Sequence, residues 1–305
     1  MTLTLIALNF SHANHCMNLI SAANATGCLP PSVYKVRDTP HAPAQLHRAV
    51  TLPSFKEPFA FQENTRLLAG TVMPVDQRPP NRLLQTLSAA DFALVHPHLE
   101  IVDLDRGKLL VEAGEELTHV YLPHSGIISS VVSLSEGQAV EVAMIGRDGI
   151  VGATEALCDA ISLSDAAVVC QGRASVIAVE DFRAIAAESA AWRQLLARHE
   201  QSLLAQAQQS VACNAAHSVE ERLSRWLLRA RDLWDGETLP MTQEQLARMI
   251  GVQRNAISIV AHALQQAGVL SYSRGQIEII DVEALRKSAC ECYHAVHAKQ
   301  AHLFK

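Results

Sequence analysis

The stretch from Thr242 to Gln266 reads TQEQLARMIGVQRNAISIVAHALQQ, and it decides the fold of the region around it. It predicts two short helices joined by a tight turn, with its first residue as an N-cap and Gln245 completing a capping box. Gly251 stands at the turn, where a residue without a Cβ turns sharply without strain. Ala247, followed four residues later by Gly251 and ten residues later by Ile257, is the packing pattern of a helix-turn-helix.

The outer face of the second helix, residues 253–266, carries the side chains that contact with the DNA major groove requires. Arg254 can donate to guanine O6 and N7, and its neighbours can pair with adenine or with phosphates. The sequence has no acidic residue between Glu244 and Glu278, which suits a surface that approaches phosphates. The residues expected to contact DNA are Thr242, Gln243, Gln253, Arg254, Asn255, Ser258, His262 and Arg274. The alternative is an ordinary helical hairpin with solvated polar side chains.

Length and composition indicate a globular protein with more than one domain. The chain has 305 residues, of which 49% are hydrophobic and 18% charged, enough for two domains with separate cores. The formal net charge of −6 argues against a general polyanion-binding protein, so any nucleic-acid site must be a local patch. No apolar run is long enough to cross a membrane, and the apolar start lacks the basic flank of a signal peptide. The seven cysteines show no framework spacing, which fits reduced thiols and a cytoplasmic location.

Residues 1–80 differ from the rest of the chain. They are rich in Asn, His, Pro and Ser without helical or strand periodicity, so we expect an unstructured extension. The alternative is that the natural protein starts at Met73. The candidate metal ligands of this extension are His12, His15, Cys16 and Cys28. Their spacing matches no standard zinc finger, so we expect solvated side chains.

Residues 81–185 predict a β-domain that follows an amphipathic helix over Arg82–His98. The expected strands are Glu100–Leu104, Lys108–Glu112, His119–Leu122, Ile127–Ser133, Ala139–Ile145, Ala166–Cys170 and Ala174–Val179. Short, regular strands with glycine-bearing turns favour a jelly roll, or double-stranded β-helix, which often holds a small ligand. With the helices around it, the chain is expected to belong to the α+β class.

A long helix is expected from Ala190 to about Cys213, within a dimerisation segment of residues 186–214. Large and polar side chains alternate at spacings of four and three along it, which gives an imperfect heptad seam. The residues expected at a dimer interface are Trp192, Leu196, His199, Leu203 and Ala207. The alternative is that this stripe packs against the barrel of its own chain.

Residues 215–305 predict a winged helix-turn-helix domain. Ser218 is expected to cap a helix over Val219–Trp234, which precedes the two helices described first. A hairpin then follows, with Arg274 at its tip as a phosphate contact. The closing helix is expected over Val282–Ala298, where two cysteines, Cys290 and Cys292, do not share a face and are interpreted as free thiols.

This order of domains resembles the Crp/Fnr superfamily of bacterial transcription regulators. The resemblance rests on RGKLLVEAGE at Arg106–Glu115 and VYLPHSGIIS at Val120–Ser129 in the sensor domain, and on HSVEERLSRWLL at His217–Leu228 with the stretch Thr242–Leu270 in the DNA-binding domain. It implies a homodimer without enzymatic activity that binds a two-fold promoter site in double-stranded DNA and contacts RNA polymerase. Asn255 and Ile259 depart from the residues usual in the family, so the half-site need not be the usual one.

The effector chemistry departs from the best-known members of the superfamily. Its cyclic-nucleotide sensors carry a Gly-Glu pair and, about ten residues on, an Arg that neutralises the cyclic phosphate. Here Gly152 precedes Ala153, the later position is Leu163-Ser164-Asp165, and the nearby Arg147 lies on the wrong side of the motif. We therefore expect no cyclic AMP, and no iron–sulfur cluster either, because the closely spaced cysteines are missing.

Three alternatives remain open at this point. The barrel could sense an unknown small molecule, or it could be a passive dimerisation module that leaves DNA affinity independent of any metabolite. It could also be a cupin-type enzyme, although HPHLE at His96–Glu100 lacks the second half of a cupin metal motif. The sensor-domain residues that could in principle ligate haem or a metal are His119, His124, Cys158 and Cys170.

Overall fold

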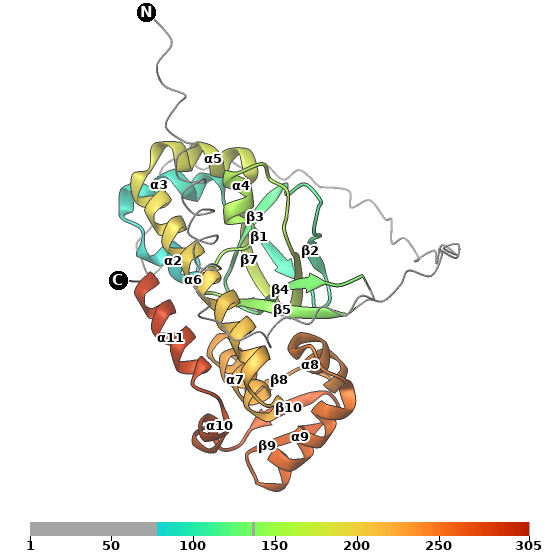
Figure 1. The fold of residues 1–305 in the computed structure, drawn as a ribbon. Coiled ribbons are helices and arrows are strands. Elements are labelled where there is room, and N and C mark those ends of the chain that lie inside the picture. Colours follow the sequence, from blue (N-terminus) through green and yellow to red (C-terminus); the bar gives the residue numbers. More distant parts are fainter. Residues whose placement is uncertain (1–77, 136–137, 305) are drawn as a thin grey trace, which may run out of the picture. The chain divides into compact units, whose positions relative to one another are not determined.

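The computed structural model describes residues 78–135 and 138–304, and Figure 1 shows their arrangement. The expectations for residues 1–77, including the candidate metal ligands and the alternative start at Met73, lie outside the described residues. Among the described helices, none combines the length and the apolarity that crossing a membrane requires.

The sensor domain is built from two antiparallel sheets. One has the order β1-β7-β3, with β1 at Glu100–Leu104, β7 at Gly172–Ala178 and β3 at His119–Pro123. The other has the order β2-β6-β4-β5, with β2 at Leu109–Val111, β6 at Asp165–Cys170, β4 at Ile127–Ser133 and β5 at Ala139–Ile145. Side chains such as Leu122, Ile128 and Ile177 are fully buried in the core of this domain. The expected jelly-roll architecture within an α+β fold is confirmed.

The single helix expected over Arg82–His98 is wrong. The structure has α2 at Arg82–Thr86, α3 at Ala89–Val95 and a short 3₁₀ helix, η2, at His96–His98. The break occurs because the backbone of Leu87 is extended and the hydroxyl of Ser88 accepts the Asp91 N–H, which caps a new helix. A short helix that we did not expect, α4 at Ala153–Leu157, follows Gly152.

Two helices follow the sheets. The first, α5 at Val179–Glu188, leads into α6 at Ala190–Ala216, whose start is capped by the Ser189 hydroxyl. Figure 1 shows α6 passing from the sensor domain toward the C-terminal helices. It is the longest element of the described chain.

Most of the α6 residues expected at a dimer interface pack against the chain's own sensor domain. Trp192 and Leu196 belong to the sensor core, and Leu203 packs against it. His199 is buried, and its Nε2 accepts the Ile150 N–H at 2.9 Å. Ala207 is half-buried and lines a cavity of the sensor domain. Trp192, Leu196 and His199 therefore pack on the barrel of their own chain, which was the alternative, whereas the place of the half-buried Leu203 and Ala207 in a dimer interface stays a prediction.

The C-terminal domain starts with α7 at Val219–Leu233, where Ser218 and Glu221 form a capping box. The helix-turn-helix, α8 at Gln243–Ile250 and α9 at Arg254–Gln266, follows it. The wing consists of β9 at Leu270–Ser273 and β10 at Gln276–Ile279, joined by a third strand, β8 at Thr238–Leu239, that we did not expect.

The single closing helix expected over Val282–Ala298 is also wrong. The chain forms α10 at Val282–Ser288, leaves the helical path at Ala289, and begins α11 at Cys292–Leu303. The second helix packs along α6 and brings Leu303 into the sensor core (Figure 1). The C-terminal segment thus returns from the wing to the sensor domain.

Candidate nucleic-acid interface

The helix-turn-helix has the geometry that its sequence predicts. Thr242 and Gln245 form the expected capping box at the start of α8. Gly251 ends α8 with a φ of 70°, a left-handed conformation that glycine adopts without strain. Ala247 and Ile257 are both buried where α8 meets α9, so the small residue admits the bulky one.

The start of α9 presents its polar side chains to solvent. Gln253, Arg254 and Asn255 are all exposed, and Gln253 forms no side-chain cap with the helix. The first turn of α9 holds no acidic residue, so its unpaired N–H groups and Arg254 present positive charge together. His262 is exposed two turns further on, beyond an exposed Ile259.

Two of the predicted contact residues bind each other. The Ser258 hydroxyl donates to Gln243 Oε1 at 2.5 Å, and the Gln243 N–H donates to the Tyr272 hydroxyl at 2.9 Å. The structure thus gives Gln243 and Ser258 a place in the packing of α8 on α9 and the wing. The prediction missed Tyr272, although an aromatic residue in the first wing strand is a signal for such packing.

The wing places Arg274 at its tip. Arg274 is exposed and adopts a positive φ of 49° between β9 and β10. This conformation is uncommon outside glycine and makes the tight turn that projects the side chain. The side chain is exposed there, and its contact with a phosphate stays a prediction.

Comparisons with protein-family models match both domains. The model described as a Crp-like helix-turn-helix domain matches residues 221–288, and the model described as a cyclic nucleotide-binding domain matches residues 101–199. Together the two matches cover more than half of the chain. The chain belongs to the Crp/Fnr family of transcription regulators. No curated protein matches it in a sequence search.

Solved structures of Crp/Fnr regulators share this fold. A putative transcriptional regulator of the Crp/Fnr family from Eubacterium rectale is 18% identical, with a TM-score of 0.55 over 68% of this chain and 96% of that chain. FixK2 from Bradyrhizobium japonicum is 16% identical, with a TM-score of 0.55 over 63% and 98% of the two chains. The c-di-GMP responsive global regulator CLP of Xanthomonas campestris is 17% identical, with a TM-score of 0.52 over 63% and 99%.

The sensor domain of this Crp/Fnr regulator contains a cavity of about 320 Å³ between its sheet and α6. Most of the lining residues are apolar, and they come from the sheet, from α6 and from the segment that leads into α4; the charged lining residues are two acids, Glu155 and Glu200. The described lining includes no Lys or Arg, and burial raises the pKa of Glu155. A cyclic phosphate would meet negative or neutral side chains here, which is unfavourable without a cation.

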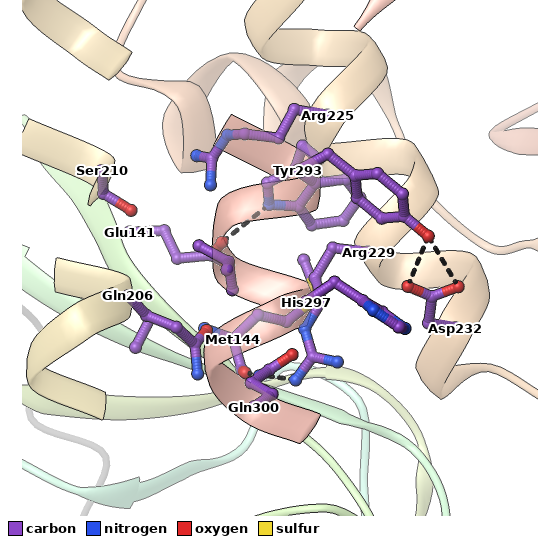
Figure 2. A pocket seen from close by; sticks show the side chains of 13 residues that line it. Glu141, Met144, Gln206, Ser210, Arg225, Arg229, Asp232, Tyr293, His297 and Gln300 are labelled. Carbon is purple, nitrogen blue, oxygen red and sulfur yellow. Dashed lines mark hydrogen bonds between the residues drawn. The ribbon is translucent and has the colours of Figure 1, made fainter. Parts of the chain in front are cut away.

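A second site lies where β5 meets α7 and α11 (Figure 2). The carboxylate of Glu141 on β5 accepts the Trp226 Nε1–H at 2.9 Å and a hydrogen bond from the Ser129 hydroxyl. Burial raises the pKa of Glu141 to about 7, against the opposing effects of these hydrogen bonds and of Arg225 and Arg229. The contact joins the sensor domain to the DNA-binding domain through one titratable side chain.

Changing Glu141→Gln should alter how stability depends on pH. In the folded protein the carboxyl group of Glu141 has a pKa of about 7. In the unfolded chain a glutamate has its ordinary pKa of about 4.3 and loses its proton at lower pH. This group's contribution is therefore present at low pH and is lost as pH rises through that window. The amide cannot ionise, so the variant should gain about 1–3 kcal/mol over wild type between pH 5 and pH 8.

Urea unfolding of both proteins at pH 5, 6, 7 and 8 measures this difference. Buried His124 and His199, whose pKa values burial lowers to about 4, titrate in the opposite sense and cancel in the comparison. Parallel stability curves for wild type and variant across this range would show that Glu141 does not titrate in the junction.

Proposed function

We propose that this Crp/Fnr regulator is a homodimer that binds a two-fold symmetric promoter site, with α9 of each copy in the major groove. The observation that carries the proposal is the exposed start of α9, where Arg254 stands in a stretch free of acidic residues. The exposed Arg274 at the wing tip is placed to add a phosphate contact. As a promoter-binding protein it would act in the cytoplasm with RNA polymerase, and it would need no catalytic activity.

The exposed face of α6 supports a second copy of this chain as the partner. Leu204 and Val211 lie seven residues apart with 54% and 71% of their surfaces exposed. They lie on a different side of the helix from Trp192 and His199, which face the sensor core, and Leu204 also borders the sensor cavity. An apolar stripe of this spacing is suited to pairing with its own twin across a two-fold axis.

Contacts between the two domains offer a route for a signal. Arg106 of the sensor domain donates through Nη2 to Gln245 Oε1 of α8 at 2.6 Å. Val140 of β5 lies so close to Gly251 that a Cβ at this position would come within 2.9 Å of the valine side chain. A ligand in the sensor cavity would contact both the sheet and α6, and so could shift these contacts.

We expect the ligand of the sensor cavity to be apolar and either uncharged or cationic. The support is the lining itself, in which apolar side chains surround the carboxyl groups of Glu155 and Glu200. Cyclic AMP does not fit this description because its phosphate has no cationic partner there. A barrel without any effector remains the second candidate, and it differs by leaving DNA affinity the same in the presence of metabolites.

Replacing Arg254→Ala should remove the preference for one base pair of each half-site. A guanidinium that donates to guanine O6 and N7 contributes about 1–3 kcal/mol of discrimination at that position. Binding titrations at one salt concentration, with the preferred duplex and with duplexes changed at single positions, measure this loss.

The matched control is Arg231→Ala, which removes an exposed arginine near the end of α7. It should change neither selectivity nor the pattern of preferred bases. An Arg254→Ala protein that discriminates single-base changes as well as wild type does would contradict the assignment of α9.

A further inference from the structure

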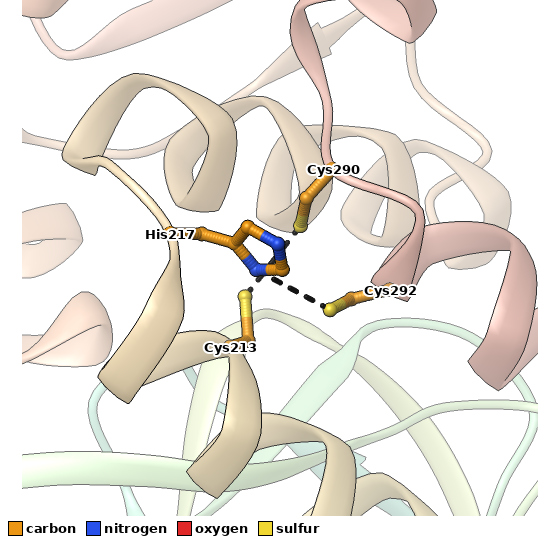
Figure 3. Close-up of side chains that lie close together, drawn as sticks. All are labelled: Cys213, His217, Cys290 and Cys292. Atoms are coloured by element: carbon orange, nitrogen blue, oxygen red, sulfur yellow. Dashed lines mark hydrogen bonds between the residues drawn. The ribbon is translucent and has the colours of Figure 1, made fainter.

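Four metal-binding side chains from distant parts of the sequence converge at the junction of α6, α7 and α11. Cys213 lies in the last turns of α6, and His217 is its C-cap residue. Cys290 lies in the break between α10 and α11, and Cys292 begins α11. Figure 3 shows the three sulfurs and the imidazole ring directed toward one another. Among the residues that the structure describes, these four form the only group of His, Cys, Asp and Glu side chains close enough together to hold a metal ion.

The distances within the cluster fit one metal ion. The sulfurs of Cys213 and Cys290 are 3.6 Å apart, and Cys292 Sγ is 3.5 Å from His217 Nδ1. All four ligand atoms lie within 4.8 Å of one another. Zinc–thiolate bonds of about 2.3 Å in a tetrahedron place two sulfurs about 3.7 Å apart. A cluster of several irons would divide the cysteines among its metal atoms and would spread the sulfurs further.

We propose that Cys213, His217, Cys290 and Cys292 form a closed Cys₃His site for one zinc-class divalent ion. Three thiolates and one imidazole bind zinc in preference to harder cations such as Mg²⁺ or Ca²⁺, which take oxygen ligands. Four protein ligands leave no open position for water or substrate, so the ion is structural and not catalytic. None of the four ligands lines the sensor cavity or belongs to the residues expected to contact DNA.

The residues around the four ligands match what a zinc site needs. Glu291 Oε1 lies 3.3 Å from His217 Nε2, which leaves Nδ1 to face the sulfurs, as in carboxylate–histidine–zinc arrangements. Gln209 Nε2 donates to Cys292 Sγ at 3.0 Å. Arg222 and Arg225 on α7 carry positive charges near the cluster, which would offset the excess negative charge of three thiolates around a divalent ion.

The burial of the cluster indicates a site that is formed by folding. Cys213, Cys290 and Cys292 are buried together and make a small cluster separate from the two hydrophobic cores. A bound ion would fasten the end of α6 to the segment from which α11 returns to the sensor domain. It would therefore stabilise the junction at which α6 ends and α7 of the DNA-binding domain begins.

The first test measures metal in the full-length wild-type protein, purified reduced and without a polyhistidine tag. Elemental analysis should find about one zinc ion per chain, and cobalt exchanged into the site should give the absorption of tetrahedral thiolate coordination. Chelation should lower the melting temperature, and added Zn²⁺ should restore it. Less than about one-tenth of an ion per chain after incubation with Zn²⁺, or a Cys213–Cys290 disulfide in freshly purified protein, would overturn the proposal.

Variants then separate the ligands from general stability. Cys290→Ser should lose the ion, whereas Cys158→Ser, at an exposed cysteine outside the cluster, should retain it. His217→Cys should keep about one ion per chain because it supplies a fourth thiolate, and Glu291→Gln should weaken zinc affinity about 10–100-fold. Retention of zinc by Cys290→Ser at wild-type affinity would contradict the ligand set.

Discussion

The double substitution Leu204→Glu, Val211→Glu should convert the protein to a monomer and weaken its binding to a two-fold DNA site about 10²–10⁴-fold. Both side chains are exposed on α6, and a dimer related by two-fold symmetry would bring each close to its own copy. Two pairs of carboxylates would then repel in a contact that apolar side chains normally fill. Sedimentation analysis gives the oligomeric state, and fluorescence anisotropy with a two-site duplex gives the affinity.

The control for this change is Ile101→Glu, which places the same charge at an apolar residue of β1 that is 58% exposed and away from α6. It should leave both the dimer and the DNA affinity intact. If the Leu204→Glu, Val211→Glu protein sediments as a dimer with wild-type affinity, then the partner surface lies elsewhere.

The second large effect is expected from Trp192→Ala. Trp192 is fully buried against Phe182, with ring centroids 5.8 Å apart in an edge-to-face arrangement. Removing a buried indole from a packed core costs about 3–5 kcal/mol of unfolding free energy. Urea unfolding in the Leu204→Glu, Val211→Glu background measures this cost without a contribution from dimer dissociation.

Trp192→Phe provides the matched comparison because it keeps an aromatic ring in the same site. It should cost about 1–2 kcal/mol, well below the alanine variant. A loss below about 1 kcal/mol for Trp192→Ala in the monomeric background would indicate that this face of α6 belongs to a dimer contact after all.

These two predictions concern two different faces of α6, which the sequence pattern did not tell apart. His199, Gln206 and Ser210 are polar, which weakened the case for a seam between two helices without indicating another partner. In the structure Gln206 Oε1 accepts the Met144 N–H at 3.3 Å, and the Ser210 hydroxyl donates to Val142 O at 3.2 Å. Gln206 and Ser210 thus form hydrogen bonds with the backbone of β5. A heptad pattern in the sequence cannot show whether the face that carries it packs on a sheet or on a second helix.

Local signals predicted the elements that local interactions determine. The capping boxes at Ser218 and Thr242 and the left-handed turn at Gly251 lie where the sequence indicates. The breaks at Ser88 and Ala289 were missed because apolar periodicity continues across them. The available signal for the first break was Ser88. A serine three residues before an acidic residue, here Asp91, is typical of a helix N-cap and indicates that a new helix begins.

Sites built from residues that are distant in the sequence could not be predicted from the sequence. The exposed Arg254 and Arg274 follow from one stretch of sequence, whereas the bond between Gln243 and Ser258 depends on how α8 packs on α9. The cysteine cluster joins segments more than 70 residues apart. The interpretation of Cys290 and Cys292 as separate thiols assumed one continuous helix, and the break before α11 removes that assumption.

The most direct test of the regulator assignment is to map the genomic DNA that the purified protein protects at physiological salt, without added cyclic AMP. We expect a two-fold site whose half-sites lie about 10–10.5 base pairs apart, centre to centre, as two copies of α9 in successive major grooves require. Protection without sequence preference, or of single half-sites only, would contradict a dimeric regulator that reads its promoter through α9.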